Sequence, residues 1–329
     1  MKKPLLAVAL TLVCVMLLLI HGKFATKNAA ENTEGKTLAV KENNIGNMVE
    51  NTEENSVEDS IEDSVENSAG ITQAEQRTIQ MQTENLKCIN YIEKDFMSSV
   101  NMATEKQVEQ IGDGAIKGGI IPHHLLAGRI IASFFKTVAS ANPDVELVVV
   151  VAPNHKRLGN AKIHTGSWDW ETPFGILNAD DEVIKQLENK CGAGTNFKLL
   201  EEEHSISSLV PYIKYFLPES KIVPVLLHGD LGLENSKSLG EKIESIIEGK
   251  NYLIIASVDF SHYLPVEKAD KMDEITIEAI KNRNATAISH MGNDNIDSPP
   301  SIITLLEAMD KAGADSMTVL GHSNSARIT

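Results

Sequence analysis

The sequence predicts an α/β protein: a single three-layer α/β/α domain with a mainly parallel central sheet, preceded by an N-terminal membrane anchor and a disordered acidic tether. Three observations predict this. Strand-like apolar runs alternate with helical stretches from residue 113 to residue 329. These runs are continuously apolar, as strands covered by helices on both faces require. Near residue 87, polar and acidic sequence gives way to sequence of globular composition.

The first 23 residues read "MKKPLLAVALTLVCVMLLLIHGK" and have the order of a secretory signal or an N-terminal anchor. The apolar run from residue 4 to residue 20 is at the lower edge of the roughly 17 to 25 residues that span a bilayer. No clean A-x-A cleavage site follows it, which favours an uncleaved anchor. Lys2 and Lys3 should stay cytoplasmic. We therefore expect a domain held outside the cell at the membrane, or a secreted one if the signal is cleaved.

Residues 24–86 are expected to form a disordered, self-repelling tether. Residues 31–66 hold eleven acidic residues against two lysines, which accounts for more than half of the net charge of −16. The stretch "ENSVEDSIEDSVENSA", residues 54–69, repeats a four-residue polar unit. A ligand-binding tail is the alternative interpretation. No basic stripe offsets the repulsion from phosphates, so we expect no nucleic-acid partner.

The globular domain is expected over residues 87–329, with its core at 113–329. A short helix is predicted within 88–100. The elements that follow are strand 117–122, helix 125–140, strand 145–153, a hairpin within 161–177, helices 179–190 and 205–216, strand 220–228, helix 234–249, strand 251–260, helices 267–283 and 299–312, and strand 316–321.

Three of the predicted strands end near a histidine. The runs are "IIPHH" at 120–124, "VVVVAPNH" at 148–155 and "LIIASVDFSH" at 253–262. In an open α/β sheet, ligands bind beyond the carboxyl ends of the strands. We therefore expect His123, His155, Asp259 and His262 to meet at one edge of the sheet.

Histidines and carboxylates at such an edge suit a divalent metal, which binds their nitrogen and oxygen atoms at about 2.0 to 2.2 Å. Two histidines and one carboxylate leave positions open for substrate and oxygen or water, as in non-haem Fe(II) oxygenases. The first candidate ligands are His123 and His155. Asp297 is the favoured carboxylate because two prolines stiffen its loop in "NDNIDSPPS", and Asp259 is its competitor. His262, on a loop after a buried strand, is expected to act as an acid or base.

His204 in "EEEHSISS" has two interpretations. In one, its side chain points into the cleft. In the other, it only precedes a helix that Ser205 caps.

Six ordered blocks give the sequence a resemblance to a known family. They are "PHH" at 122–124, "PNH" at 153–155, "WETPFG" at 170–175, "EHS" at 203–205, "SVDFSHY" at 257–263 and "DSPPS" at 297–301. Together they resemble the Memo family, also called AmmeMemoRadiSam system protein B, which is similar in fold to the catalytic subunits of class III extradiol ring-cleavage dioxygenases. The resemblance covers essentially all of residues 113–329 and leaves out the anchor and the tether.

The resemblance implies a metal-binding cleft whose ligands map to His123 and His155, with His204 and His262 lining the same pocket. Memo proteins typically supply a cysteine from a Cys-Gly pair as the third group, whereas Asp297 and Ser298 stand there in this sequence. This departure disfavours thiolate-dependent copper chemistry. It brings the site closer to the dioxygenase pattern of two histidines and one carboxylate.

We therefore expect a Memo-like metal-binding protein that holds Fe(II), with copper or zinc as alternatives. As an enzyme it would be an oxygen-dependent oxidoreductase related to extradiol dioxygenases, in which His262 moves protons, Asp259 holds its tautomer and His204 positions substrate. One alternative is a non-catalytic extracytoplasmic protein that binds a peptide or small molecule in the same cleft. Another is a metal-dependent hydrolase with bound water as the nucleophile. Membrane contact is expected through the N-terminal segment only.

Overall fold

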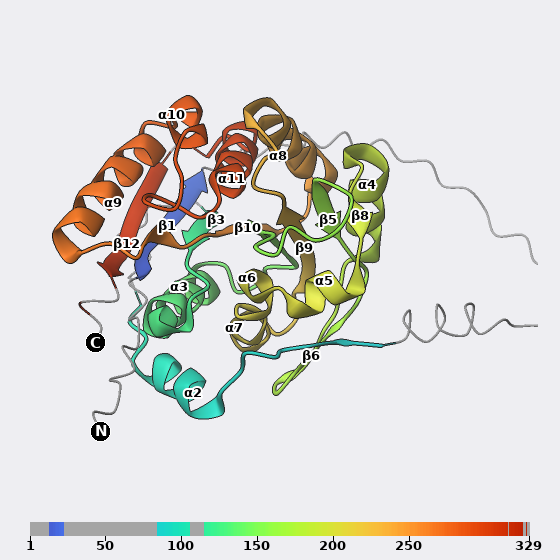
Figure 1. Ribbon diagram of the computed structural model, residues 1–329. Helices are drawn as coiled ribbons and strands as arrows, with labels where there is room; N and C mark the ends of the chain where they lie inside the picture. Colours follow the sequence, from blue (N-terminus) through green and yellow to red (C-terminus); the bar gives the residue numbers. More distant parts are fainter. Residues whose placement is uncertain (1–12, 23–83, 106–114, 315, 325–326, 328–329) are drawn as a thin grey trace, which may run out of the picture. The chain divides into compact units, whose positions relative to one another are not determined.

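The computed structural model describes residues 13–22, 84–105, 115–314, 316–324 and 327 (Figure 1). The chain divides into two units, Met1–Phe24 together with Thr83–Thr329, and Ala25–Gln82. The predicted tether lies almost wholly outside the described residues, so its disorder stays a prediction.

The main sheet is mixed but mostly parallel, and its described strands follow the order β11-β1-β3-β10-β4-β9-β5-β8, with β12 paired to β1. Strands β3, β10, β4 and β9 are parallel neighbours, while β5 is antiparallel to β9 and β1 is antiparallel to its partners. The predicted mainly parallel α/β sheet is thus confirmed. The strands are β1 (Val13–Gly22), β3 (Ala115–Ile121), β4 (Leu147–Pro153), β5 (Ile163–Thr165), β8 (Gly194–Thr195), β9 (Lys221–Leu227), β10 (Tyr252–Ser257), β11 (Phe260–His262) and β12 (Ser316–Asn324).

A small second sheet joins β2 (Leu86–Lys87), β6 (Trp170–Thr172) and β7 (Gly175–Leu177). Strands β6 and β7 form the hairpin predicted within residues 161–177. The hydroxyl of Thr172 closes the turn because it donates to the carbonyl of Gly175 and accepts from the amide of Phe174. The first part of that region, β5, pairs with the main sheet instead.

Helices cover both faces of the main sheet, as the continuous apolar runs require. Val148 and Val150 of β4 pack with helices α2, α3, α5, α6 and α7, whereas Val149 and Val151 pack with α4, α8, α10 and α11. Figure 1 shows α3 and α7 on one side of the sheet and α8 and α11 on the other. The helices are α2 (Glu93–Asn101), α3 (Gly128–Ala141) with the 3₁₀ turn η3 (Leu125–Ala127) before it, α4 (Asp181–Cys191), α5 (Phe197–Glu202), α6 (His204–Ser207), α7 (Val210–Phe216), α8 (Leu233–Ile247), α9 (Val266–Lys281), α10 (Ala285–Ser289) and α11 (Pro299–Lys311).

Helix α11, whose N-cap Ser298 follows Asp297, packs closely against α8. A Cβ atom on Gly240 of α8 would lie 2.4 Å from the carbonyl oxygen of Thr304 in α11, so only glycine allows this approach. At its first turn, the Ser298 hydroxyl accepts from the amide of Ser301 and caps α11.

Strand β1 occupies the described part of the segment expected to be a membrane anchor. Its backbone pairs antiparallel with β3 and β12. Within the described ranges, no helix is long and apolar enough to cross a membrane. The described residues therefore do not support the predicted anchor, and a position outside the cell stays a prediction.

Candidate metal centre

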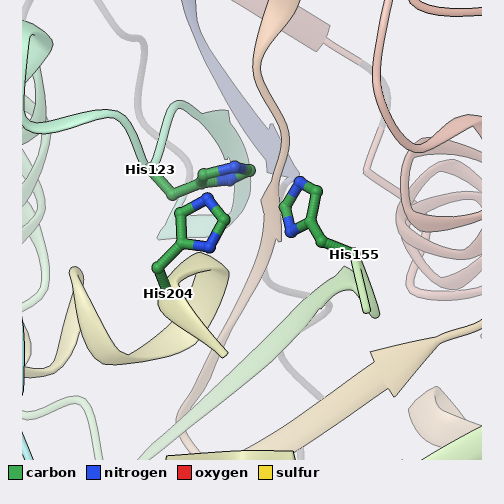
Figure 2. A group of neighbouring side chains, drawn as sticks. All are labelled: His123, His155 and His204. Atoms are coloured by element: carbon green, nitrogen blue, oxygen red, sulfur yellow. The ribbon is translucent and has the colours of Figure 1, made fainter. Parts of the chain in front are cut away.

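The parallel strands bring the predicted site residues together at their carboxyl ends. Strand β10 lies between β3 and β4. His123, His155 and Asp259 each stand two residues beyond the end of one of these three strands. Asp297 joins them because its amide donates to the carbonyl of Asp259, at 3.1 Å. His204 is the first residue of α6, and Figure 2 shows its ring turned toward the rings of His123 and His155.

One carboxylate oxygen faces both predicted histidine ligands. Asp297 Oδ2 lies 3.3 Å from His123 Nε2 and 3.4 Å from His155 Nε2. Two donor atoms bound to one ion at about 2.1 Å, with an angle of about 90 to 110° between the bonds, are about 3.0 to 3.4 Å apart. Asp297 Oδ2 therefore stands at the spacing of a shared metal ion from each of the two histidine nitrogens.

A buried serine fixes the tautomer of His123. The Ser257 hydroxyl donates to the carbonyl of Ser205, at 2.6 Å, so it accepts from the Nδ1–H of His123, at 3.2 Å. The Nε2 lone pair of His123 then faces Oδ2 of Asp297 and, at 3.5 Å, Oδ2 of Asp259. Burial lowers the pKa of His123 and outweighs both carboxylates, so the ring is neutral. A lone pair that faces two carboxylates is repelled by them unless a cation or a proton lies between.

Glu203 orients His155. This buried carboxylate accepts from the His155 ring through Oε1, at 2.8 Å, and from the His155 amide through Oε2, at 2.9 Å. It also accepts from the amide of Ser205 and lies 3.2 Å from Nδ1 of His204. His155 therefore presents Nε2 to Asp297. A carboxylate that holds the second nitrogen in this way is the usual support of a metal-binding histidine.

The pKa values of Glu203 and His155 are shifted in opposite directions. Burial raises the pKa of Glu203, but hydrogen bonds from His155 and His204 outweigh it and hold that pKa well below its usual range. Burial lowers the pKa of His155, but hydrogen bonds to Asp297 and Glu203 overcome this effect and raise it to about 10. Without a metal, a proton on Nε2 therefore occupies the place beside Asp297 where a metal would bind.

Asp259 and Asp297, the two candidate carboxylates, differ in the hydrogen bonds that their Oδ1 atoms accept. Oδ1 of Asp259 accepts from the amides of His123 and His124, at 3.0 and 3.3 Å, and so holds the loop after β3. Oδ1 of Asp297 is buried and has no hydrogen-bond partner among the described residues. An unpartnered buried anionic oxygen is costly unless a cation satisfies it. The geometry favours Asp297 as the ligand and Asp259 as a support of His123.

The remaining predicted residues occupy different places. The ring of His204 stacks on that of His155, with centroids 4.5 Å apart, and its side chain is 48% exposed at the open side. His262 lies in the short strand β11 and not on the predicted loop, because residues 260–262 pair with β1. Its side chain is outside the described residues, so its acid or base role, and the predicted support from Asp259, stay predictions.

Two sets of side chains in the described part of the chain can hold a metal. One is His123, His155 and His204, and the other is His123, Asp259 and Asp297. They share His123. The predicted set of His123, His155 and Asp297 is neither of these two groups but takes one further member from each.

Two supporting residues escaped the sequence analysis. Glu203 is the last of three glutamates and looks like part of an exposed acidic run, although it is 1% exposed. Its position directly before His204 in the "EHS" block was the available signal. Ser257 ends an apolar strand, and nothing in its sequence context indicates a contact with His123.

Comparisons with known proteins agree with the six blocks. A Memo-like protein family model matches residues 92–329. A MEMO1 family protein of Pyrobaculum aerophilum is 29% identical over 228 residues, which cover 67% of this chain and 80% of that protein. One of Caldivirga maquilingensis is 30% identical over 215 residues, 63% of this chain and 75% of that protein. One of Methanopyrus kandleri is 33% identical over 175 residues, 51% of this chain and 61% of that protein.

The family match includes every predicted site residue, from His123 to Asp297, and extends over most of the chain. The resemblance drawn from the sequence blocks is therefore confirmed. The chain belongs to the family of Memo-like proteins.

Proposed function

We propose that this Memo-like protein binds a divalent metal ion, preferably Fe(II), through His123, His155 and Asp297, and acts as an oxygen-dependent oxidoreductase. The observation that carries the proposal is the position of Asp297 Oδ2, within 3.4 Å of Nε2 of both histidines. Two imidazoles and one carboxylate are the ligands of non-haem iron oxygenases. The carboxylate in place of the family's cysteine favours iron over copper.

A bound iron ion supplies redox chemistry and open coordination positions. The protein's own groups hold and orient its ligands: Ser257 fixes the tautomer of His123, and Glu203 fixes that of His155. His204, half exposed beside both rings, contacts the substrate at the open side. His262 moves the proton, and this assignment rests on the sequence alone.

Metal analysis tests the site. The full chain, reconstituted anaerobically with Fe(II) and desalted, should retain about one metal ion per chain. His155→Ala should lose it because one of the three donors is removed. His290→Ala, which changes an exposed histidine on the edge of α10, is the matched control and should retain it. Equal metal content in all three proteins contradicts the ligand assignment.

Activity assays separate the reaction classes. Oxygen consumption with a catechol panel supports the oxidoreductase. Hydrolysis of ester or phosphate substrates by the zinc-loaded protein, without oxygen consumption, supports the metal-dependent hydrolase. A protein that stays metal-free at micromolar iron, zinc or copper yet binds a peptide or small molecule in the cleft supports the non-catalytic binding protein.

We also propose that the domain lies outside the cytoplasm, held at the membrane or secreted. The support is the order of two lysines, an apolar run and polar sequence in residues 1–23. Protease added to intact cells or spheroplasts should then digest the domain. Protection of the domain until the cells are lysed would place it inside.

A further inference from the structure

A cavity lies beside the candidate metal centre. Its volume is about 970 Å³, at the upper end of the range for small-molecule sites. Two of its lining residues connect it to the centre, because His124 follows His123 and Ser207 shares α6 with His204. The rest of the wall comes from α2, η3, α3, α7 and β12. None of the proposed metal ligands lines it.

Most of the wall is apolar. Ile92, Met102, Leu125 and Leu126 line the cavity and are among the most exposed large hydrophobic side chains of the described residues. The aromatic rings of Phe96 and Tyr212, 4.6 Å apart, also line it. An apolar body of drug-like size, in particular a flat aromatic one, therefore fits this wall.

Arg129 is an exposed cation in this wall that no carboxylate of the described residues pairs with. Among the described residues its guanidinium makes no ion pair or hydrogen bond, in a chain with a net charge of −16. The other cationic arginine in the wall, Arg327, is paired with Asp270. The lining carboxylate, Asp95, lies in the first turn of α2, where the helix dipole stabilises a negative charge. The cavity thus offers an available positive group to an anion.

Ser207 provides a second, independent polar group. Its hydroxyl is buried and has no hydrogen-bond partner in the described part of the chain. Buried hydroxyls are normally bonded, and since Ser207 lines the cavity, a ligand oxygen that reached this hydroxyl would satisfy it. The nearby hydroxyls of Ser99 and Tyr212 bond to each other, at 2.9 Å, and do not satisfy it.

We propose that this cavity binds a small aromatic carboxylic acid. The carboxylate pairs with Arg129, a ligand oxygen accepts from Ser207, and the ring lies against Leu125, Leu126 and Phe96. The proposal goes beyond the metal chemistry and does not require a metal ion.

The test uses the full chain freed of metal with a chelator, and 4-oxo-4-phenylbutanoate as the probe. Titration calorimetry should show the acid binding at least about tenfold more tightly than its neutral amide and than 4-phenylbutylamine, since a hydrogen-bonded charge pair contributes about that factor. Arg129→Gln should weaken binding of the acid about tenfold and leave binding of the amide unchanged. Lys185→Gln removes a positive charge from an exposed position of α4 and should change the affinity for neither the acid nor the amide.

Ser207→Ala separates ligand contact from structure. Because it removes an unpartnered buried hydroxyl, the melting temperature should stay the same or rise while the affinity for the acid falls several-fold. Equal affinity for acid and amide, tighter binding of the amine, no binding at all, or an unaffected Arg129→Gln variant each overturns the proposal. All variants should retain wild-type iron content on reconstitution, so failure of the metal centre and failure of this cavity give different results.

Discussion

Glu203 holds two histidines of the candidate centre, although the sequence analysis did not single it out. Its two oxygens reach the ring and amide of His155, the amide of Ser205 and the ring of His204. It touches no ion in the proposed scheme, yet it decides which nitrogen His155 presents. Its role is therefore to position ligands.

Glu203→Gln should lower the affinity for Fe(II) about 10- to 100-fold, the usual effect of losing a carboxylate behind a metal-binding histidine. The neutral amide keeps the shape but weakens the hydrogen bond to His155 and lowers the basicity of its Nε2. Competition with a fluorescent chelator measures the change. Glu202→Gln is the matched control, since Glu202 pairs with Lys156 at the surface. Equal affinities for the two variants would refute the positioning role.

Cys88 should be unreactive in the folded protein. Burial, with a smaller contribution from Glu171, raises the pKa of its thiol to about 12. At pH 8 the reactive thiolate should be rarer by a factor of about 1,000 than in a free cysteine of pKa about 8.5. Iodoacetamide labelling followed by mass spectrometry should therefore be slow in buffer and fast in urea. Equal rates would show that this thiol is accessible.

The meeting of the candidate ligands at one edge of the sheet was predictable, because apolar runs show where strands end. The apolar runs place His123 and His155 at the carboxyl edge without knowledge of the sheet order. The sequence favoured Asp297 over Asp259 because prolines stiffen its loop, and the structure adds a separate reason: backbone amides bond to Oδ1 of Asp259, whereas Oδ1 of Asp297 has no partner among the described residues. The hydrogen bond between Ser257 and His123 depends on which ring nitrogen of His123 carries the proton, and no sequence pattern shows this.

At the level of elements, prediction succeeded where apolar patterns are long. Strands β3, β4, β9 and β10 and helices α3, α8, α9 and α11 lie within a few residues of their expected ranges. Helix α5 is six residues long and capped by Asn196. It is too short for a helical repeat of apolar residues to be recognised in the sequence. The expected helix 205–216 is split into α6 and α7, with Pro211 in the first turn of α7, where its missing N–H costs no hydrogen bond.

Gly240→Ala should destabilise the domain by about 1 to 3 kcal/mol because the new methyl group overpacks the contact between α8 and α11. For a domain of this size, the melting temperature should fall by about 2 to 4 °C for each kcal/mol of lost stability. Glu241→Ala, an exposed neighbour on the same helix, is the control and should change stability by less than about 0.5 kcal/mol. An unchanged melting temperature for Gly240→Ala would mean that α8 and α11 can shift apart enough to fit the methyl group without loss of stability.

At the level of the whole molecule, removal of residues 25–82 should leave the melting temperature within about 2 °C of the full chain. The reason is that these residues form a separate unit from Met1–Phe24 and Thr83–Thr329. Calorimetry of the full and shortened chains makes the comparison. A clearly lower value for the shortened chain would show that the acidic segment stabilises the domain.

The order of strands in the sheet was beyond sequence analysis. Nothing in the apolar run at residues 13–22 distinguishes a membrane segment from a strand that pairs with β3 and β12, since both are continuously apolar. The pairing of distant strands depends on the complete chain, while hydropathy describes only a local stretch.

The wide separation of the donors along the chain bears on when the ion is acquired. His123 and Asp297 are 174 positions apart, and β10 must already lie between β3 and β4 before their side chains can meet. In the proposed scheme the ligand set is therefore incomplete until the sheet has formed. Local metal supply then helps to select the occupant, since intrinsic affinities alone would favour copper over iron. In that scheme, the compartment in which the chain folds would help to decide which ion the site binds.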